Sequence, residues 1–151
     1  MNATVRIQRE SFDVAAETSA LTDGRADIGA VVSFTGLCRD EGGRLSALEL
    51  EHYPGMAEEE IERIARMAGE RWPLLGLTVV HRYGLVRPGE EIVLVLTASA
   101  HREAAFEAAS FLMDYLKTRA PFWKREHLKD GTVGEWVAAK SADDAAAGRW
   151  S

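Results

Sequence analysis

The sequence predicts one domain of the α+β class, built on a largely antiparallel sheet with two main helices. The chain has 151 residues, close to the commonest size of a single domain. Hydrophobic residues make up 46% and charged residues 28%, which is ordinary for a globular protein and excludes a disordered or fibrous chain. The order of the elements mixes strand-like segments that can form hairpins with two longer segments of helical periodicity. This arrangement is typical of α+β folds. We expect residues 1–140 to form the domain and residues 141–151 to form a polar, Ala-rich tail.

Four elements are expected in the first third of the chain. Alternation of polar and apolar residues indicates a strand near the N-terminus, and a β-branched run between two glycines predicts a buried strand. A Pro-Gly pair ends the strand that follows. In order, the expected elements are a strand around Val5 and Ile7, a short helix over Phe12–Leu21 capped by Ser11, a buried strand over Ala30–Leu37 and a strand over Leu45–Tyr53.

The rest of the chain predicts two long helices, each ended by a proline. Apolar residues recur at helical spacing in both, and Pro73 and Pro121 stop them. Between the helices, two strands flank a turn at Pro88-Gly89 and are expected to pair as a hairpin. The expected elements are a helix from Ala57 to Trp72, strands over Leu77–Tyr83 and Ile92–Ala98, a helix from about His101 to Thr118, an extended segment at Phe122–Lys124 and a last short strand at Glu135–Val137.

Charge and cysteine content exclude several classes of function. A net charge of −6 argues against a general nucleic-acid binder, which carries the opposite sign. No run of 18 apolar residues is present, so no membrane span is expected, and the N-terminus lacks the apolar stretch of a secretory signal. The single Cys38 excludes an internal disulfide and a multi-cysteine metal cluster. These features predict a cytoplasmic protein that binds neither nucleic acid nor membrane.

One stretch runs against the acidic character of the chain. Residues 117–129 hold one acid, Glu126, and five basic residues: Lys117, Arg119, Lys124, Arg125 and Lys129. Lys117 falls in the last turn of the long helix and Lys124 lies beyond Pro121, so a change of direction at the proline can bring the two amines together. Met113 and Lys117 are spaced i, i+4 and share a helix face. A lysine at this position also complements the helix dipole, and spacing alone does not separate that structural role from a functional one.

Two His-Arg pairs and one loop supply further candidates. His101-Arg102 opens the long helix, where unpaired N–H groups favour an anion, although Ser99 as a plain N-cap explains the same pattern. His81-Arg82 lies in a strand. Arg39 opens a loop after the buried strand, a place where functional residues project. Cys38 beside it could be a nucleophile, but a small buried hydrophobe is the commoner role of a lone cysteine.

Ordered blocks over residues 29–137 resemble one known family. The blocks are Gly29–Gly36 (GAVVSFTG) with Arg39, Leu50–Met56 (LEHYPGM), His81-Arg82 with Pro88-Gly89-Glu90, Ser99–Arg102 (SAHR), Met113–Lys117 (MDYLK) and Pro121–Glu126 (PFWKRE). Together they resemble the large, catalytic subunit of molybdopterin synthase. Blocks of this length in one order are far more specific than any short motif.

The resemblance implies an α/β-hammerhead type of α+β fold, a homodimer and a defined reaction. Each end of the dimer would bind a small ubiquitin-like sulfur-carrier subunit, giving a heterotetramer. The carrier's C-terminal Gly-Gly thiocarboxylate would enter a pocket of the large subunit. Two sulfurs would then pass to cyclic pyranopterin monophosphate and form the dithiolene of molybdopterin. The implied reaction requires no metal and no organic cofactor.

The same resemblance assigns the residues of the pocket. Its two lysines correspond to Lys117, whose ammonium would orient the thiocarboxylate, and Lys124, which would act as general acid or base. The sequence leaves open which of the two lysines has which role. The implied substrate-binding residues are Arg39, His101, Arg102, Phe34, Met113 and Lys140. Lys140 stands where the family commonly has an arginine that reaches the neighbouring subunit's pocket, and it keeps the charge but not the bidentate fork.

Two other functions stay open at this level. A non-catalytic module could hold a ubiquitin-like partner without needing both lysines. A cysteine sulfurtransferase could carry a persulfide on Cys38, which requires an exposed, reactive thiol. The remaining acidic groups, Glu49 with Glu51 and Glu58 to Glu60, fit solvated faces.

Overall fold

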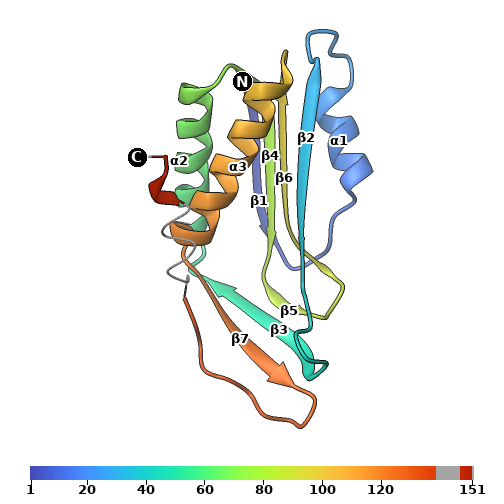
Figure 1. The fold of residues 1–151 in the computed structure, drawn as a ribbon, viewed down its shortest axis with the longest axis vertical. Coiled ribbons are helices and arrows are strands. Elements are labelled where there is room, and N and C mark those ends of the chain that lie inside the picture. Colours follow the sequence, from blue (N-terminus) through green and yellow to red (C-terminus); the bar gives the residue numbers. More distant parts are fainter. Residues whose placement is uncertain (139–146, 151) are drawn as a thin grey trace.

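A four-stranded sheet forms the body of the protein in the computed structural model, which describes residues 1–138 and 147–150 (Figure 1). Its strand order is β1-β4-β6-β2. β1 (Asn2–Gln8) lies parallel to β4 (Leu74–Arg82), whereas β6 (Glu91–Ser99) runs antiparallel to both β4 and β2 (Ala30–Leu37). The α+β class and the largely antiparallel pairing expected from the sequence are confirmed.

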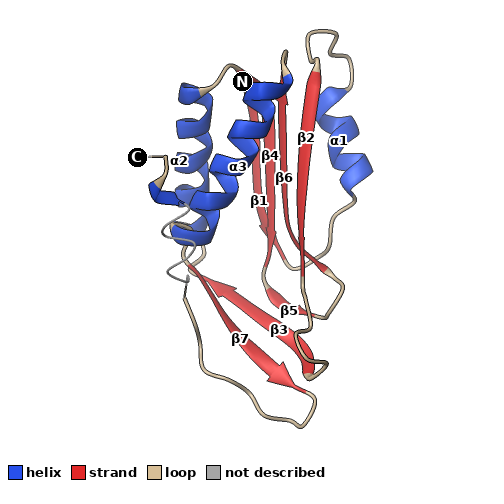
Figure 2. Ribbon diagram, viewed as in Figure 1, coloured by secondary structure: helices blue, strands red, loops and turns tan. Residues whose placement is uncertain are grey.

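Helices cover both faces of this sheet (Figure 2). α2 (Met56–Arg71) and α3 (Arg102–Thr118) pack on one face, and α1 (Val14–Thr22) packs on the other. Because side chains alternate along a strand, Val79 contributes to the core under α2 and α3 whereas Val80 contributes to the core under α1. None of the helices in residues 1–138 and 147–150 is long and apolar enough to cross a membrane.

A second, smaller sheet lies at one end of the body, with strand order β5-β3-β7 (Figure 1). β3 (Leu45–His52) pairs antiparallel with both β5 (Gly84–Val86) and β7 (Phe122–Leu128). β5 follows β4 after a single residue, so a continuous stretch of chain joins the two sheets. A third apolar cluster lies at this end and consists of Cys38, Leu45, Leu50 and Val86.

The strand over Ala30–Leu37 is present as β2, but the expectation that it is buried is wrong. β2 is an edge of the main sheet, and Val31, Phe34 and Leu37 are 36%, 42% and 56% exposed. The β-branched composition of the segment reflects its preference for extended backbone and does not by itself imply cover on both faces. An apolar edge strand carries unpaired N–H and C=O groups that favour pairing with another chain.

Three smaller expectations are also corrected. Asp13 caps α1 in place of Ser11, since its Oδ1 accepts a hydrogen bond from the Ala16 N–H at 3.1 Å. β4 and β6 pair as expected, but β5 intervenes and pairs with β3, so the connection is longer than a simple hairpin turn. In place of a last strand at residues 135–137, Val137 forms a single bridge with Lys124.

The last described residues pack back onto the helices. The Trp150 ring centre lies 5.6 Å from that of Trp72 and 5.7 Å from that of Phe111. An Arg71 N–H group donates to the Trp150 carbonyl oxygen at 2.7 Å. The composition of the segment at 141–151 gave no sign of this contact, and its residues 141–146 and 151 lie outside the described chain.

Candidate active site

The end of α3 and the start of β7 carry the two lysines that the sequence singled out. Lys117 is exposed in the last turn of α3, and Lys124 is half-buried as the third residue of β7. α3 ends at Thr118 and β7 begins directly after Pro121, so the proline ends the helix as expected. The end of α3 and the start of β7, which carry these lysines, lie where the main body meets the small sheet (Figure 1).

Lys124 shares one face of β7 with Phe122, because side chains alternate along a strand. Across the ladder, Phe122 is paired with His52 and Lys124 with Leu50. Leu50 and His52 are only 6% and 8% exposed, so this is the covered face of the small sheet. Lys124 therefore belongs to the covered face and not to the solvated one.

His81, at the end of β4, joins these groups. Its ring stacks on Phe122 with centroids 3.8 Å apart and planes inclined by 16°. Burial lowers the pKa of His81 to about 4, and the positive charge of Lys117 contributes to the lowering. His81 is consequently uncharged at neutral pH.

An ion-pair network on the other face of the small sheet holds β7 to β3. Glu49 Oε1 accepts hydrogen bonds from Arg125 Nε and His127 Nε2, both at 2.8 Å. These bonds, first that from His127 and then that from Arg125, lower the pKa of the Glu49 carboxyl. The Arg125 guanidinium also lies 4.4 Å from the centre of the Trp136 ring. The expectation that Glu49 lies on a purely solvated face is wrong, because its cross-strand partner is the basic Arg125.

Phe34 and Met113 supply apolar surface on the main body. Met113 is half-buried one turn before Lys117 and packs against the core under α3. Phe34 is paired with Val95, which contributes to the same core, so Phe34 lies on the α3 side of the β2 edge. Both residues are on the side of the sheet that carries the lysine-bearing helix.

Arg39 and the His101-Arg102 pair are not brought to the lysines within one chain. Arg102 begins α3 whereas Lys117 falls in its last turn, which places the two roughly 22 Å apart along the helix at about 1.5 Å per residue. Arg39 is exposed and pairs with Glu41 near the Leu45 end of β3. Lys140 lies outside the described residues.

The start of α3 also differs from the simple capping expected of Ser99. The N-cap is His101, which makes no side-chain hydrogen bond to the first turn. The Ser99 hydroxyl donates instead to the Pro73 carbonyl oxygen at 3.0 Å. The exposed His101 and Arg102 thus open a helix whose first N–H groups lack a side-chain cap, a setting that favours an anion.

Cys38 and Arg82 have structural roles. Cys38 is 3% exposed, its Sγ lies 3.8 Å from the Val86 carbonyl oxygen, and burial raises the pKa of its thiol. These features match a buried hydrophobe and oppose a nucleophile. The Arg82 guanidinium donates to the carbonyl oxygens of Arg9 and Glu91, both at 2.9 Å, and is 8% exposed. Of the two His-Arg pairs, the one in β4 is therefore not an exposed anion site.

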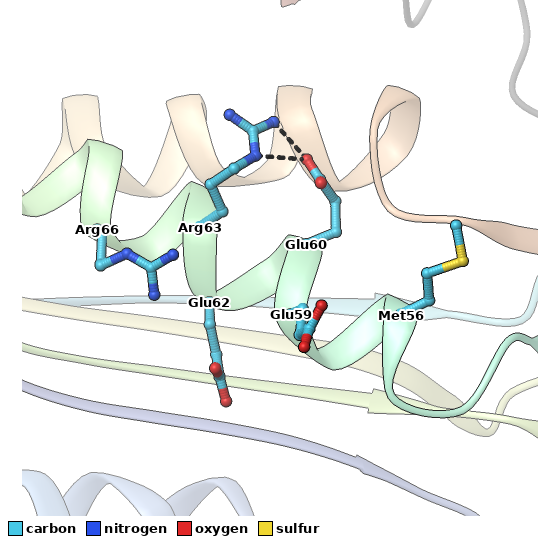
Figure 3. Close-up of a pocket in the computed structure, with 6 residues that line it drawn as sticks. All are labelled: Met56, Glu59, Glu60, Glu62, Arg63 and Arg66. Carbon is cyan, nitrogen blue, oxygen red and sulfur yellow. Dashed lines mark hydrogen bonds and ion pairs between the residues drawn. The ribbon is translucent and has the colours of Figure 1, made fainter.

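A surface hollow lies along the exposed side of α2 (Figure 3). It is lined by Met56, Glu59, Glu60, Glu62, Arg63 and Arg66. Arg63 donates to Glu60 one turn before it, so the charges of this face partly satisfy one another. Within residues 1–138 and 147–150, no three His, Cys, Asp or Glu side chains gather closely enough to hold a metal ion.

Sequence reasoning missed the aromatic groups at the junction of the sheets, His52, His81 and Phe122. One signal was available, since His81 belongs to the His-Arg pair that the sequence places in a strand. Their convergence on Phe122 depends on the pairing of β3 with β7 and on the placement of β4, which local spacing does not reveal. Taken together, these features define an α+β protein of two sheets that carries two lysines at the junction between them.

Comparisons with known proteins identify the family. The model of the MoaE protein family matches residues 7–119. A relative from Mesorhizobium japonicum, named molybdopterin synthase catalytic subunit, is 75% identical over 147 residues, which cover 97% of this chain and 92% of the relative. The solved structure of a molybdopterin biosynthesis MoaE protein from Burkholderia ambifaria matches with a TM-score of 0.85 at 50% identity, covering 98% of this chain and 97% of that one.

A solved structure with lower sequence identity has a similar fold. A protein–protein complex of subunits 1 and 2 of molybdopterin-converting factor from Helicobacter pylori gives a TM-score of 0.72 at 21% identity, covering 91% of this chain and 90% of that one. At this identity the likeness shows the fold alone. The chain belongs to the MoaE family, whose curated members here are molybdopterin synthase catalytic subunits, and it is therefore an enzyme subunit.

Proposed function

We propose that the chain transfers sulfur from the C-terminal thiocarboxylate of a small ubiquitin-like carrier subunit to cyclic pyranopterin monophosphate, as a cytoplasmic sulfurtransferase. Two such transfers build the dithiolene of molybdopterin. The observation that carries this function is the placement of Lys117 and Lys124 at one junction of a chain whose net charge is −6. A localised cationic site on an acidic protein suits ligands that are themselves anions.

The charges of both expected ligands fit this site. The thiocarboxylate and the cyclic phosphate are anions, and an ammonium group placed where negative charge develops stabilises the transition state. Arg125 contributes little to such a site, because Glu49 holds its guanidinium. The two lysines are thus the residues that we assign to catalysis.

Each transfer takes two steps, and each step forms one bond and breaks another. The thiocarboxylate sulfur attacks a carbon of the precursor and displaces an oxygen substituent, which takes up a proton as it leaves; the C–O bond is replaced by a C–S bond, and the carrier is linked to the precursor through a thioester. Addition of water to the carbonyl carbon then breaks its bond to sulfur, so that sulfur stays on the product and the carrier leaves as a carboxylate. Lys117 would orient the thiocarboxylate and stabilise the charge on its carbonyl oxygen, and Lys124 would move the protons.

A complete site needs two copies of the chain. His101 and Arg102 lie at the far end of α3 from Lys117, so they join the same pocket only if a second copy supplies them. The exposed, apolar edge of β2 is the surface that a second copy would cover. A twofold axis at this edge reverses the direction of the second copy and brings the start of its α3 to the level of Lys117. The homodimer expected from the sequence resemblance is therefore part of the proposed function.

The carrier is the second expected partner. The related Helicobacter pylori structure is a complex of two subunits of molybdopterin-converting factor, which supports pairing of this fold with a second subunit. One carrier at each end of a homodimer gives the heterotetramer. The carrier's C-terminal tail would reach Lys117 and Lys124, with Phe34 and Met113 as apolar contacts for the tail or the pterin.

Reconstitution tests this function directly. The purified chain is mixed with thiocarboxylated carrier and cyclic pyranopterin monophosphate, and the dithiolene product is measured after conversion to a fluorescent derivative. Carrier with an ordinary C-terminal carboxylate serves as the matched control, since it binds alike but holds no sulfur. Product from the thiocarboxylated carrier alone supports sulfur transfer. No product from either carrier contradicts it and leaves the non-catalytic binding module.

A further inference from the structure

The C-terminal residues of the chain dock on α3, the helix that carries Lys117 (Figure 1). Arg149 Nε and the indole N–H of Trp150 both donate to Oδ2 of Asp114 in α3, the former at 3.0 Å. Arg149 Nη2 lies 2.8 Å from the same oxygen, so the contact is also an ion pair. One carboxylate of α3 thus holds the last two described residues of the chain.

Further contacts fix this docked segment in place. The Trp150 ring packs edge-on against the rings of Trp72 and Phe111, with centroids 5.6 Å and 5.7 Å away. An Arg71 N–H group at the end of α2 donates to the Trp150 carbonyl oxygen at 2.7 Å. The segment therefore has an anchorage of its own, and it presents its side-chain donors to α3 in a defined geometry.

Asp114 precedes Lys117 by three residues in α3. Residues spaced i, i+3 are neighbours on a helix surface, about 5–6 Å apart between their Cβ atoms, and an acid that precedes a base stands in the order that suits the helix dipole. In the described part of the chain, however, Asp114 pairs with Arg149 and not with Lys117. The docked segment thus occupies the acid that the helix would otherwise offer to this lysine.

We propose that Arg149 and Trp150 are positioning residues for sulfur transfer: by holding the Asp114 carboxylate, they keep it from pairing with the Lys117 ammonium. This role rests on the proposed function, in which that ammonium binds the thiocarboxylate. A carboxylate released beside Lys117 would compete with the anionic ligand for the same cation. The positive charge of Arg149 also compensates the charge of Asp114, which would otherwise repel an incoming anion.

The single-turnover rate of sulfur transfer tests this role in a full-length double variant, Arg149→Met with Trp150→Phe, here named the released variant. It keeps an apolar stem and an aromatic ring but offers Asp114 no donor. An ion pair at contact distance in water corresponds to roughly a 5-fold change in an equilibrium, so the rate should fall by about 3- to 10-fold. The ratio of the released to the wild-type rate should approach one as the salt concentration rises, since salt screens an exposed ion pair. A wild-type rate at low salt overturns the role.

Removal of the Asp114 charge separates this role from a purely structural one. Adding Asp114→Asn to the released variant should restore the rate to within about 2-fold of wild type, because an amide forms no ion pair with an ammonium. Glu107→Gln makes the same change at an exposed acid of α3 further from Lys117, so it is the matched control and should restore nothing. Failure of Asp114→Asn to restore the rate, or an equal effect of Glu107→Gln, would assign the loss to disturbed packing and overturn the role.

Chemical labelling tests the pairing without a catalytic readout. An ion-paired ammonium reacts more slowly with an acylating reagent, because pairing favours the charged, unreactive form of the amine. Labelling of Lys117 is measured by mass spectrometry against the exposed Lys129 as internal reference. It should slow by about 2- to 5-fold in the released variant and recover when Asp114→Asn is added. Unchanged labelling of Lys117 in the released variant overturns the competition by Asp114.

Two further outcomes have a defined meaning. If the released variant does not fold, Arg149→Met alone removes the opposing charge and keeps the Trp150 ring; it should slow both labelling and transfer, and wild-type values of both overturn the role. If Lys117→Ala and Lys124→Ala keep the wild-type rate, the proposed function fails instead, and the labelling still decides whether the docked segment keeps Asp114 from Lys117.

Discussion

Substitution of Cys38 tests whether the transferred sulfur is carried by a partner or on this chain. The thiol is buried and its pKa is raised by burial, so a persulfide on it could not meet an incoming substrate. We predict that Cys38→Ala keeps most of the sulfur-transfer activity, with a stability loss of about 1 kcal/mol from the smaller side chain. Product formation with thiocarboxylated carrier, measured beside thermal melting, checks this. Complete loss of product in a folded variant would favour a persulfide mechanism.

The titration of His81 predicts how stability depends on pH. The folded state holds the pKa of His81 at about 4, against an ordinary value of 6.5, so the unfolded chain binds more protons between these values. The contribution of neutral His81 is full above pH 6.5 and is lost as pH falls toward 4. The expected loss between pH 7 and pH 5 is about 2 kcal/mol.

Urea unfolding of wild type and His81→Gln measures this loss. The difference in free energy of unfolding between pH 7 and pH 5 should be smaller in the variant by about 2 kcal/mol. Equal pH dependence in the two proteins would show that His81 titrates normally in the folded state.

The places of the two lysines, at the end of a helix and just beyond a proline break, could be predicted from the local sequence, whereas their role in a pocket is implied only by the family resemblance. The surroundings of His81 could not be predicted, because Phe122 comes from a strand 41 positions further along the chain and only the tertiary fold stacks the rings. The ion pairs of Glu49 were missed for the same reason: its partners Arg125 and His127 come from another strand.

At the scale of elements, the attachment of β7 to β3 decides where Lys124 lies. Glu49 bonds both Arg125 and His127 across the ladder, and Glu126 beside them is exposed. We predict that Glu49→Gln lowers the free energy of unfolding by about 1 kcal/mol, because it leaves Arg125 without its ionic partner. Glu126→Gln removes the same charge from an exposed site and should stay within about 0.5 kcal/mol of wild type. Equal stability of all three proteins in urea would show that the network contributes nothing.

The elements themselves were predicted to different degrees. α2 and α3 follow from apolar periodicity closed by Pro73 and Pro121, signals that depend on the local chain alone. The existence of β2 was predicted correctly but its burial was not, since strand composition does not reveal whether a neighbour covers the second edge. The short β5 was missed because three residues are too few for a periodic pattern, and its pairing with β3 places it in the other sheet.

At the scale of the whole molecule, the distance between the two ends of α3 predicts an active site that is built from residues of two copies of the chain. Sedimentation at micromolar concentration should give a dimer, and a species of 16.6 kDa alone would contradict this.

Lys117→Ala and Arg102→Ala should each lose activity as separate dimers. When the two are mixed and allowed to exchange subunits, half of the dimers are mixed and each regains one intact site, so about a quarter of the wild-type rate should return. A mixture no more active than its components would place both residues in the site of one chain.

The central claim, that Lys117 and Lys124 catalyse sulfur transfer, is tested most directly by the single-turnover rate of molybdopterin formation with pre-thiocarboxylated carrier. We predict that Lys117→Ala and Lys124→Ala each lower this rate by about 100- to 10,000-fold, the usual contribution of a positioned acid–base or charge-stabilising group. Lys117→Arg should recover little, because a guanidinium keeps the charge but neither fits the same point nor gives up a proton. The free energy of unfolding of Lys117→Ala should stay within about 0.5 kcal/mol of the wild-type value, since that side chain is exposed. Wild-type rates in both alanine variants would contradict the account.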